Sequence, residues 1–243
     1  MKVFLNILLP VYNEERRITK GVEGTVAFLK EIGFDDYRIT IEDNASKDRT
    51  EEIARELCER YPQVNYERLD KKGVGVAFRN GVKSNPCDIV GYMDIDLSTD
   101  IRHLEQVINI FKNEPDTLMV NGSRFSKTSD TTGRKWYRNL SSYGLTFLLK
   151  LRLHMKASDS ICGFKFFRKD FVEKLIAESG DEAGWFFIIE LLLRAERKGS
   201  VVRELPVRWQ DDYDSKVDYI KVISNYLKNI SRLRKQFRKE GIL

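Results

Sequence analysis

The chain has 243 residues, of which 42% are hydrophobic and 33% are charged, and its formal net charge is +5. This length suits one α/β domain. The weak basic excess, without a basic stripe carrying stacking aromatics, speaks against nucleic-acid binding. The three cysteines lack both metal-ligand spacing and the even number of a disulfide framework, which favours a reducing, cytoplasmic compartment. With two histidines, a histidine-based metal site or catalytic triad is not expected.

The first half of the chain alternates predicted strands with predicted helices. Runs rich in β-branched and aromatic residues predict strands, and apolar residues at helical spacing predict helices. The strands are expected at residues 3–11, 37–42, 64–69, 88–93 and 118–121, and the helices at 48–61, 74–84 and 101–113. Such alternation predicts an α/β fold with a mostly parallel central sheet flanked by helices.

The second half is less regular. Helices are expected at residues 134–153, 185–198 and 217–239, strands at 163–167 and 201–209, and a polar, turn-rich loop at 126–133. No repeat, low-complexity tract or linker divides the chain. We therefore expect a single domain over residues 1–243.

The strongest chemical signal is the sequence MDIDLSTD, residues 93–100. An apolar strand leads directly into Asp94 and Asp96, and residues two apart on an extended chain point to the same face. Ligands of parallel sheets collect at the carboxyl ends of the strands. Paired carboxylates there suit Mg²⁺ or Mn²⁺, which take oxygen ligands and bind partly through substrate phosphates. Solvated loop acids are the alternative for an Asp-x-Asp pair alone, and the buried strand before the pair favours the metal.

Polar residues also follow the first two predicted strands, in LLPVYNEE (8–15) and IEDNASKDRT (41–50). If these strands are neighbours, Glu14 and Asp43 face one crevice, where carboxylates can accept hydrogen bonds from a nucleobase or a ribose. Helix capping by the Asn, Glu and Ser residues of these segments is the alternative, and both interpretations can hold together.

A weaker signal is KKGVGVAFRNGV, residues 71–82. Two glycines let the backbone approach a ligand at the start of a helix. Lys72 and Arg79 add positive charge where a pyrophosphate could lie.

In this order and spacing, the four stretches resemble family 2 glycosyltransferases of the GT-A fold. Three later stretches resemble the polyprenyl-phosphate sugar transferases, which include dolichyl-phosphate glucosyl- and mannosyltransferases: DSICGFKFFRKD (159–170), DEAGWFFIIELLLRAERKG (181–199) and ELPVRWQDDYDSKVD (204–218). The resemblance covers nearly the whole chain. It implies a nucleotide-sugar-binding half over residues 1–125, an acceptor half over 126–216 and a basic C-terminal helix over 217–243.

The resemblance also implies a role for each matching residue. Asp94 and Asp96 would bind Mg²⁺ or Mn²⁺ and the diphosphate. The nucleotide sugar would contact Pro10, Tyr12, Glu14, Asp43, Lys72, Arg79, Asp94, Arg124, Ser215 and Lys216. The acceptor phosphate would meet Arg138, Lys165 and Arg168, and Asp159 and Glu190 would line the acceptor cleft. Relatives often carry Arg where this chain has Tyr143.

The implied reaction is inverting transfer of a hexose from a nucleoside-diphosphate sugar, UDP-glucose-like ahead of GDP-mannose, to a polyprenyl or dolichyl phosphate. A phosphate oxygen is already anionic, so no base is obligatory. The alternative acceptor, a glycan hydroxyl, would need Asp159 or Glu190 as general base. A further alternative is an inactive nucleotide-binding subunit docked on a membrane protein, which the presence of both Asp94 and Asp96 disfavours.

A prenyl phosphate lies in a bilayer, yet no stretch reaches the ~18 apolar residues that a membrane span needs. The expected location is therefore peripheral, on the cytoplasmic face of a membrane. Residues 140–153 or the basic amphipathic tail 217–239 could contact the membrane surface. The tail could equally cover the protein's own core or contact a membrane protein.

Overall fold

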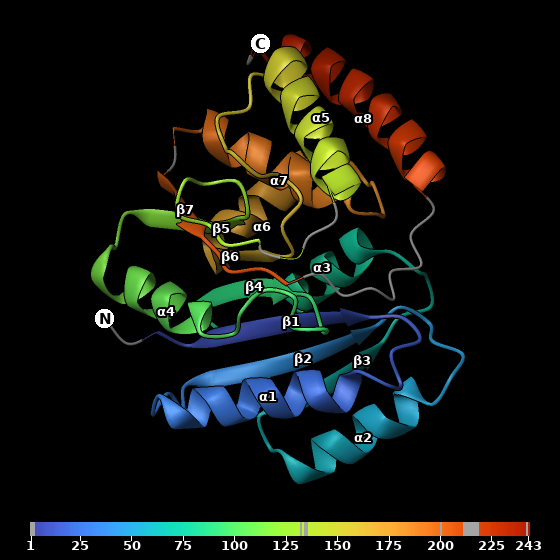
Figure 1. Ribbon diagram of the computed structural model, residues 1–243, viewed down its shortest axis with the longest axis vertical. Coiled ribbons are helices and arrows are strands. Elements are labelled where there is room, and N and C mark those ends of the chain that lie inside the picture. The colour runs from blue at the N-terminus through green and yellow to red at the C-terminus, as the bar shows by residue number, and fades with distance from the viewer. Residues whose placement is uncertain (1–2, 132, 134–135, 200, 211–218, 242) are drawn as a thin grey trace.

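A computed structural model describes residues 3–131, 133, 136–199, 201–210, 219–241 and 243; of residues 136–140 and 219–223 it describes the backbone. The strands are β1 (Leu5–Val11), β2 (Tyr37–Asp43), β3 (Val64–Arg68), β4 (Ile89–Met93), β5 (Thr117–Ser123), β6 (Phe164–Arg168) and β7 (Val201–Pro206). The helices are α1 (Ile18–Glu31), α2 (Thr50–Arg60), α3 (Val74–Lys83), α4 (His103–Asn113), α5 (Trp136–Leu153), α6 (Lys169–Glu178), α7 (Phe186–Arg197) and α8 (Tyr219–Lys239) (Figure 1).

The described strands form a seven-stranded sheet in the order β3-β2-β1-β4-β6-β5-β7. β6 runs antiparallel to β4 and β5, and the other neighbouring strands are parallel. This arrangement confirms the predicted mostly parallel α/β fold. Val11 pairs with Asp43 at the ends of β1 and β2, and β4 lies on the other side of β1. The carboxyl ends of β1, β2 and β4 therefore meet at one edge of the sheet.

Helices cover both faces of the sheet, with α1, α2 and α4 on one side and α3 and α5–α8 on the other (Figure 1). The burial of β1 on both faces explains why its sequence, apart from Asn6, is hydrophobic. Leu5, Ile7 and Leu9 pack into the core with α1, α2 and α4, whereas Leu8 packs into the core of the opposite face. A strand buried on both faces needs apolar residues at every position rather than at alternate ones.

Two helices were missed by the sequence analysis, α1 and α6. α1 buries Ile18, Val22, Phe28 and Leu29, which are spaced along one helical face. Its glycines and β-branched residues have low helix propensity, so this helix depends on packing against the sheet. Tertiary burial therefore outweighs the local preference in this segment.

The C-terminal helix α8 packs on its own domain. Ile230, Leu233 and Phe237 are at most 4% exposed and belong to the same core as α7. Of the alternatives considered for the tail, packing on its own core describes these residues of α8, while Lys228, Lys235, Arg238 and Lys239 are exposed. Among the described residues, no helix is both long enough and apolar enough to span a membrane.

Candidate functional site

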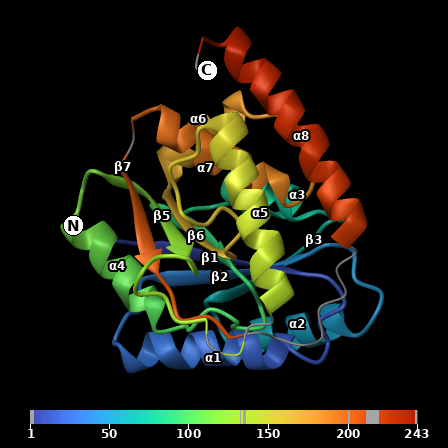
Figure 2. The ribbon, with the colours of Figure 1, turned by 45° about the horizontal axis from the view of Figure 1, so that its top comes forward.

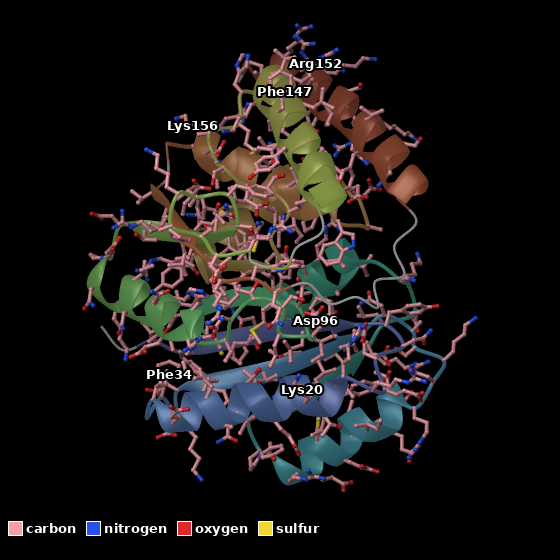
Figure 3. The ribbon with its side chains drawn as sticks, in the orientation of Figure 1. Lys20, Phe34, Asp96, Phe147, Arg152 and Lys156 are labelled. Carbon is pink, nitrogen blue, oxygen red and sulfur yellow. The ribbon has the colours of Figure 1, made fainter. Side chains whose placement is uncertain are left out.

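The two carboxylates of the Asp-x-Asp pair lie in a turn that follows β4. The Asp94 N–H donates to the Gly163 carbonyl at 3.2 Å, and the Leu97 N–H returns to the Asp94 carbonyl at 3.2 Å. The Asp96 carboxylate accepts the Ser98 N–H at 2.9 Å. Asp94 and Asp96 are both partly exposed, and Asp96 lies in the middle of the molecule, at the level of the sheet (Figure 3). The pair is therefore accessible at a strand end, as predicted.

Two glycines allow close packing around this turn. A Cβ on Gly163 would lie 2.1 Å from Asp94 Oδ2, and one on Gly21 would lie 2.2 Å from the Ile95 carbonyl oxygen. Both distances are far inside van der Waals contact. A larger residue at position 21 would displace the turn, and one at position 163 would displace the Asp94 carboxylate. The sequence analysis assigned no role to either glycine, because their partners are distant in the sequence.

The charge around Asp94 favours a bound cation. Burial and the neighbouring Asp96 carboxylate raise the pKa of Asp94 to about 7, against the opposing effect of Arg124 and Lys165. Among the described residues, no third His, Cys, Asp or Glu joins the pair to complete a metal cage. Two carboxylates that leave the other positions to phosphate and water fit Mg²⁺, which binds in this way, and their oxygens also suit Mn²⁺.

A buried ion pair between Arg124 and Asp159 lies close enough to the turn for its charge to act on Asp94. The Arg124 guanidinium donates two hydrogen bonds to Asp159, at 2.7 and 3.0 Å, and its backbone N–H donates a third at 3.1 Å. Burial alone would raise the pKa of Asp159, but Arg124 outweighs it and the pKa is lowered. Neither side chain is more than 6% exposed. Arg124 is therefore engaged with Asp159, and it influences Asp94 through its charge.

Lys165 is fully buried beneath the same turn. Its ammonium donates to Asn121 Oδ1 at 2.6 Å and to the Cys162 carbonyl at 2.9 Å, and burial lowers its pKa. The Asn121 amide in turn donates to the Asp159 carbonyl at 2.9 Å. The sequence analysis missed Asn121, although a polar residue within a buried strand is a recognisable signal.

The structure does not bring Lys165 and Arg168, two of the three predicted acceptor cations, to the same place. Arg168 donates to the carbonyls of Thr117 and Phe111 at 3.0 and 3.2 Å. It pairs with Ile89 at the start of β4, so it lies at the sheet edge opposite Asp94. The physical reason is that β6 runs antiparallel to β4 and carries its last residue away from the turn. The side chain of Arg138 lies outside the described residues.

The loops after β1 and β2 are joined by hydrogen bonds. The two strands are neighbours, as a shared crevice requires. The Asn13 N–H donates to Ser46 Oγ at 2.9 Å, and the Glu14 N–H donates to Thr50 Oγ1 at 2.8 Å. These bonds join the two loops and are not helix caps, because within the described part of the chain neither α1 nor α2 has a side-chain cap hydrogen bond. Glu14 keeps a partly exposed side chain beside them.

Asp43 is fully buried and its carboxylate has internal partners. It accepts hydrogen bonds from the Ser46 N–H at 2.8 Å and the Tyr66 hydroxyl at 2.7 Å, and it pairs with Arg68 at 3.3 Å. Burial, together with Asp43, raises the pKa of Tyr66 to about 12. The Asp43 carboxylate therefore stabilises the loop after β2 and is not exposed to solvent in this structure.

The other predicted donor residues divide into two groups. Lys72 Nζ lies 3.4 Å from the centre of the Tyr12 ring, and Pro10 is partly exposed at the end of β1. Arg79 instead turns inward, donating to the Glu182 carbonyl at 2.9 Å and lying 3.5 Å from the Phe187 ring centre. Arg79 therefore anchors the loop before α7.

Glu190 faces α8 rather than the turn. Its carboxylate pairs with Arg194 at 3.1 Å and with Arg232 at 2.6 Å, and it accepts the Gly180 N–H at 3.2 Å. Ser215 and Lys216 lie outside the described residues. Gln210, which precedes them, donates its N–H to the Ser98 carbonyl at 2.8 Å.

A buried acid next to the crevice was also missed. Glu42 is fully buried on β2, and it accepts one hydrogen bond from the Asn80 amide, at 3.3 Å. Its Oε1 has no hydrogen-bond partner among the described residues. Burial and the neighbouring Glu67 raise the pKa of Glu42 to about 8, so the carboxyl is protonated at neutral pH.

We expect this proton to make stability pH-dependent. The folded protein keeps the Glu42 proton up to about pH 8, whereas the unfolded chain loses it near the ordinary pKa of 4.5. The stabilising contribution is therefore complete below pH 4.5 and is lost as the pH rises to about 8. In urea unfolding across this range, Glu42→Gln should flatten the slope of the unfolding free energy relative to wild type. Parallel pH profiles for the two proteins would contradict the assignment.

The single sheet covered by helices on both faces, with a partly exposed carboxylate pair at a strand end, defines an α/β protein with a candidate cation site. The chain belongs to glycosyltransferase family 2, because the family model described as Glycosyl transferase family 2 matches residues 6–176. Glycosyltransferase AglD of Haloferax volcanii is 32% identical over 224 residues, which cover 91% of this chain but 35% of AglD. The chain thus spans about a third of that relative.

A second relative matches over most of both chains. Dolichyl-phosphate beta-glucosyltransferase ALG5D of Trichomonas vaginalis is 25% identical over 252 residues, covering 96% of this chain and 77% of the relative. Among solved structures, glucosyl-3-phosphoglycerate synthase from Mycobacterium tuberculosis with Mn²⁺ and UDP-glucose has a TM-score of 0.71 at 15% identity, over 96% and 79% of the two chains. Mannosyl-3-phosphoglycerate synthase from Rubrobacter xylanophilus has a TM-score of 0.69 at 16% identity, over 99% and 76%. These similarities confirm the GT-A fold.

Proposed function

We propose that this glycosyltransferase moves a hexose, with inversion, from a nucleoside-diphosphate sugar to a polyprenyl phosphate. One observation carries the choice of acceptor. Asp159 and Glu190, the two carboxylates considered as general bases, are both buried in ion pairs with arginines. A hydroxyl acceptor needs a base, whereas a phosphate monoester is already anionic near neutral pH. The dolichyl-phosphate beta-glucosyltransferases among the relatives support the same acceptor class.

The donor would lie across the carboxyl ends of β1, β2 and β4. Asp94 and Asp96 would hold Mg²⁺ or Mn²⁺, which supplies a Lewis acid that offsets charge on the leaving diphosphate. Tyr12 and Lys72 would border the nucleotide, and the charges of Arg124 and Lys165 beneath the turn would favour an anionic ligand above it. A UDP-hexose is the preferred donor, since ALG5D is named a glucosyltransferase and the Mycobacterium tuberculosis neighbour binds UDP-glucose.

In the transfer step, an acceptor phosphate oxygen attacks the anomeric carbon from the face opposite the diphosphate. The new C–O bond forms as the bond to the diphosphate breaks, which inverts the anomeric centre. No proton needs to be removed from the acceptor. The chain's contribution is to position the two substrates and to stabilise the departing charge.

A transfer screen tests this function. UDP- and GDP-sugars are each combined with a short prenyl phosphate or a free oligosaccharide, with and without Mn²⁺. We expect transfer from UDP-glucose to the prenyl phosphate that depends on the metal. Transfer to the oligosaccharide alone would favour the glycan-hydroxyl acceptor, and nucleotide binding without any turnover would favour an inactive subunit.

A matched pair of variants tests which of the predicted cations contacts the acceptor phosphate. Of the three predicted residues, Lys165 and Arg168 have internal partners, so the proposal retains Arg138. Arg138→Ala should raise the KM for prenyl phosphate roughly tenfold, the effect of losing one charged hydrogen bond, and leave the KM for the sugar nucleotide unchanged. Arg168→Ala, at the opposite sheet edge, should change neither KM. An equal rise in both KM values for Arg138→Ala would place that residue at the donor.

A further inference from the structure

α5 carries an apolar stripe on its outer side, formed by Tyr143, Phe147 and Leu151. These residues are 52%, 67% and 60% exposed, and their spacing of four places them on one face of the helix. The opposite face is buried against the protein through Ser142, Thr146, Leu149 and Leu153. The helix therefore has apolar side chains on two faces, and the described residues cover only one of them.

The surroundings of the stripe are strongly basic. α5 and α8 contact each other along the same side of the molecule (Figures 1 and 2). α5 contains three Lys or Arg residues and α8 contains seven, and neither helix contains an Asp or Glu. The two helices together therefore carry more positive charge than the net charge of the whole chain, which is +5. The rest of the chain is accordingly net negative. Positive charge is thus concentrated on this helix pair.

Cations also border the stripe directly. Lys150 and Arg152 flank Leu151 in the sequence and are exposed, and neither has a carboxylate partner among the described residues. Phe147 and Arg152 lie toward the outer end of α5, on the far side of the molecule from Lys20 on α1 (Figure 3). An apolar stripe bordered by exposed cations is the pattern of a helix that lies in a membrane interface.

We propose that the Tyr143–Phe147–Leu151 stripe inserts into the surface of an anionic lipid bilayer, with Lys150, Arg152 and the basic side of α8 on the headgroups. Anionic headgroups attract clustered cations, and the bilayer covers the exposed apolar area. A second copy of this chain fits less well, because two basic surfaces of like charge repel each other. The purpose of this docking, though not the docking itself, rests on the proposed function.

The stripe also leads toward the candidate site. The Tyr143 ring packs on the Phe125 ring, with centroids 4.4 Å apart. Phe125 directly follows Arg124, whose charge acts on Asp94. A lipid whose phosphate lies near the turn could therefore extend its hydrocarbon chain along the stripe into the bilayer.

Vesicle binding tests the proposal. The full chain is mixed with vesicles of phosphatidylcholine and phosphatidylserine, or of phosphatidylcholine alone, and bound protein is separated by flotation. Wild type should bind the mixed vesicles more tightly. The double variant Phe147→Ser/Leu151→Ser should weaken this binding roughly tenfold or more, from lost apolar burial. Val201→Ser is the matched control, because Val201 is 46% exposed on β7 and its replacement should change nothing.

Two further measurements make the test decisive. The double variant should keep the wild-type circular dichroism spectrum and melting temperature, which shows that it is folded. Lys150→Gln/Arg152→Gln should reduce binding to the mixed vesicles and leave binding to phosphatidylcholine unchanged. Wild-type vesicle binding by Phe147→Ser/Leu151→Ser would overturn the proposal, as would a dimer that the same changes dissociate without any vesicle binding. If wild type binds vesicles through the stripe but does not glycosylate prenyl phosphate, the docking surface stands and the proposed acceptor falls.

Discussion

Asp96→Asn is expected to lower sugar transfer by about 100- to 1,000-fold, the loss typical of removing one electrostatic stabiliser of the transition state. The amide oxygen of asparagine can still accept the Ser98 N–H, so the turn after β4 should keep its shape. The removed charge is one of two that repel each other, and its loss should lower the pKa of Asp94 from about 7. Thermal stability without metal should therefore stay constant or rise while activity falls.

Asp100→Asn is the control for this experiment. Asp100 follows in the same segment but pairs with Arg102 rather than with Asp94, so its replacement should leave kcat largely unchanged. The measurements are initial rates with and without added Mn²⁺ and thermal melts with and without EDTA. Full activity of wild type in excess EDTA, or of Asp96→Asn with metal, would show that the pair does not act through a cation.

Asp159→Asn should cost about 3–5 kcal/mol of unfolding free energy, because it leaves the buried Arg124 guanidinium without its counterion. Both partners are almost fully buried, at 6% and 0% exposure, so solvent cannot replace the lost interaction. The measurement is urea unfolding of wild type and variant at neutral pH. Glu52→Gln is a suitable control, since Glu52 forms an exposed pair with Arg49 and such pairs contribute little.

The pH dependence of the Asp159→Asn effect gives an independent check. The folded-state pKa of Asp159 is lowered below the ordinary value of 3.8. The stabilisation is therefore complete above that value and disappears as the pH falls through the lowered folded-state pKa. The difference between wild type and variant should shrink in acid. A difference that stays constant down to the lowest accessible pH would mean that the lost stability comes from packing rather than from charge.

Much of the fold could be predicted from local patterns. The mostly hydrophobic sequence of β1 indicated a strand, and the alternation of strands and helices indicated a mostly parallel sheet. α1 escaped prediction because its glycines and β-branched residues weaken the helical signal. The antiparallel direction of β6 also escaped, since an apolar run carries no information about the direction in which a strand enters a sheet.

The sequence by itself determined that Asp94 and Asp96 follow a buried strand, because strand burial is a local property. The expectation that the two acids share the face of an extended chain did not account for the turn in which they lie. The tertiary structure decided which charges are already paired. Arg124 and Asp159 lie 35 positions apart, and Glu190 and Arg232 lie 42 apart, so nothing local indicates that either pair will meet. It also placed Arg168 at the edge away from the turn. Ion pairing depends on distance through space, and that distance is set only when the strands and helices assemble.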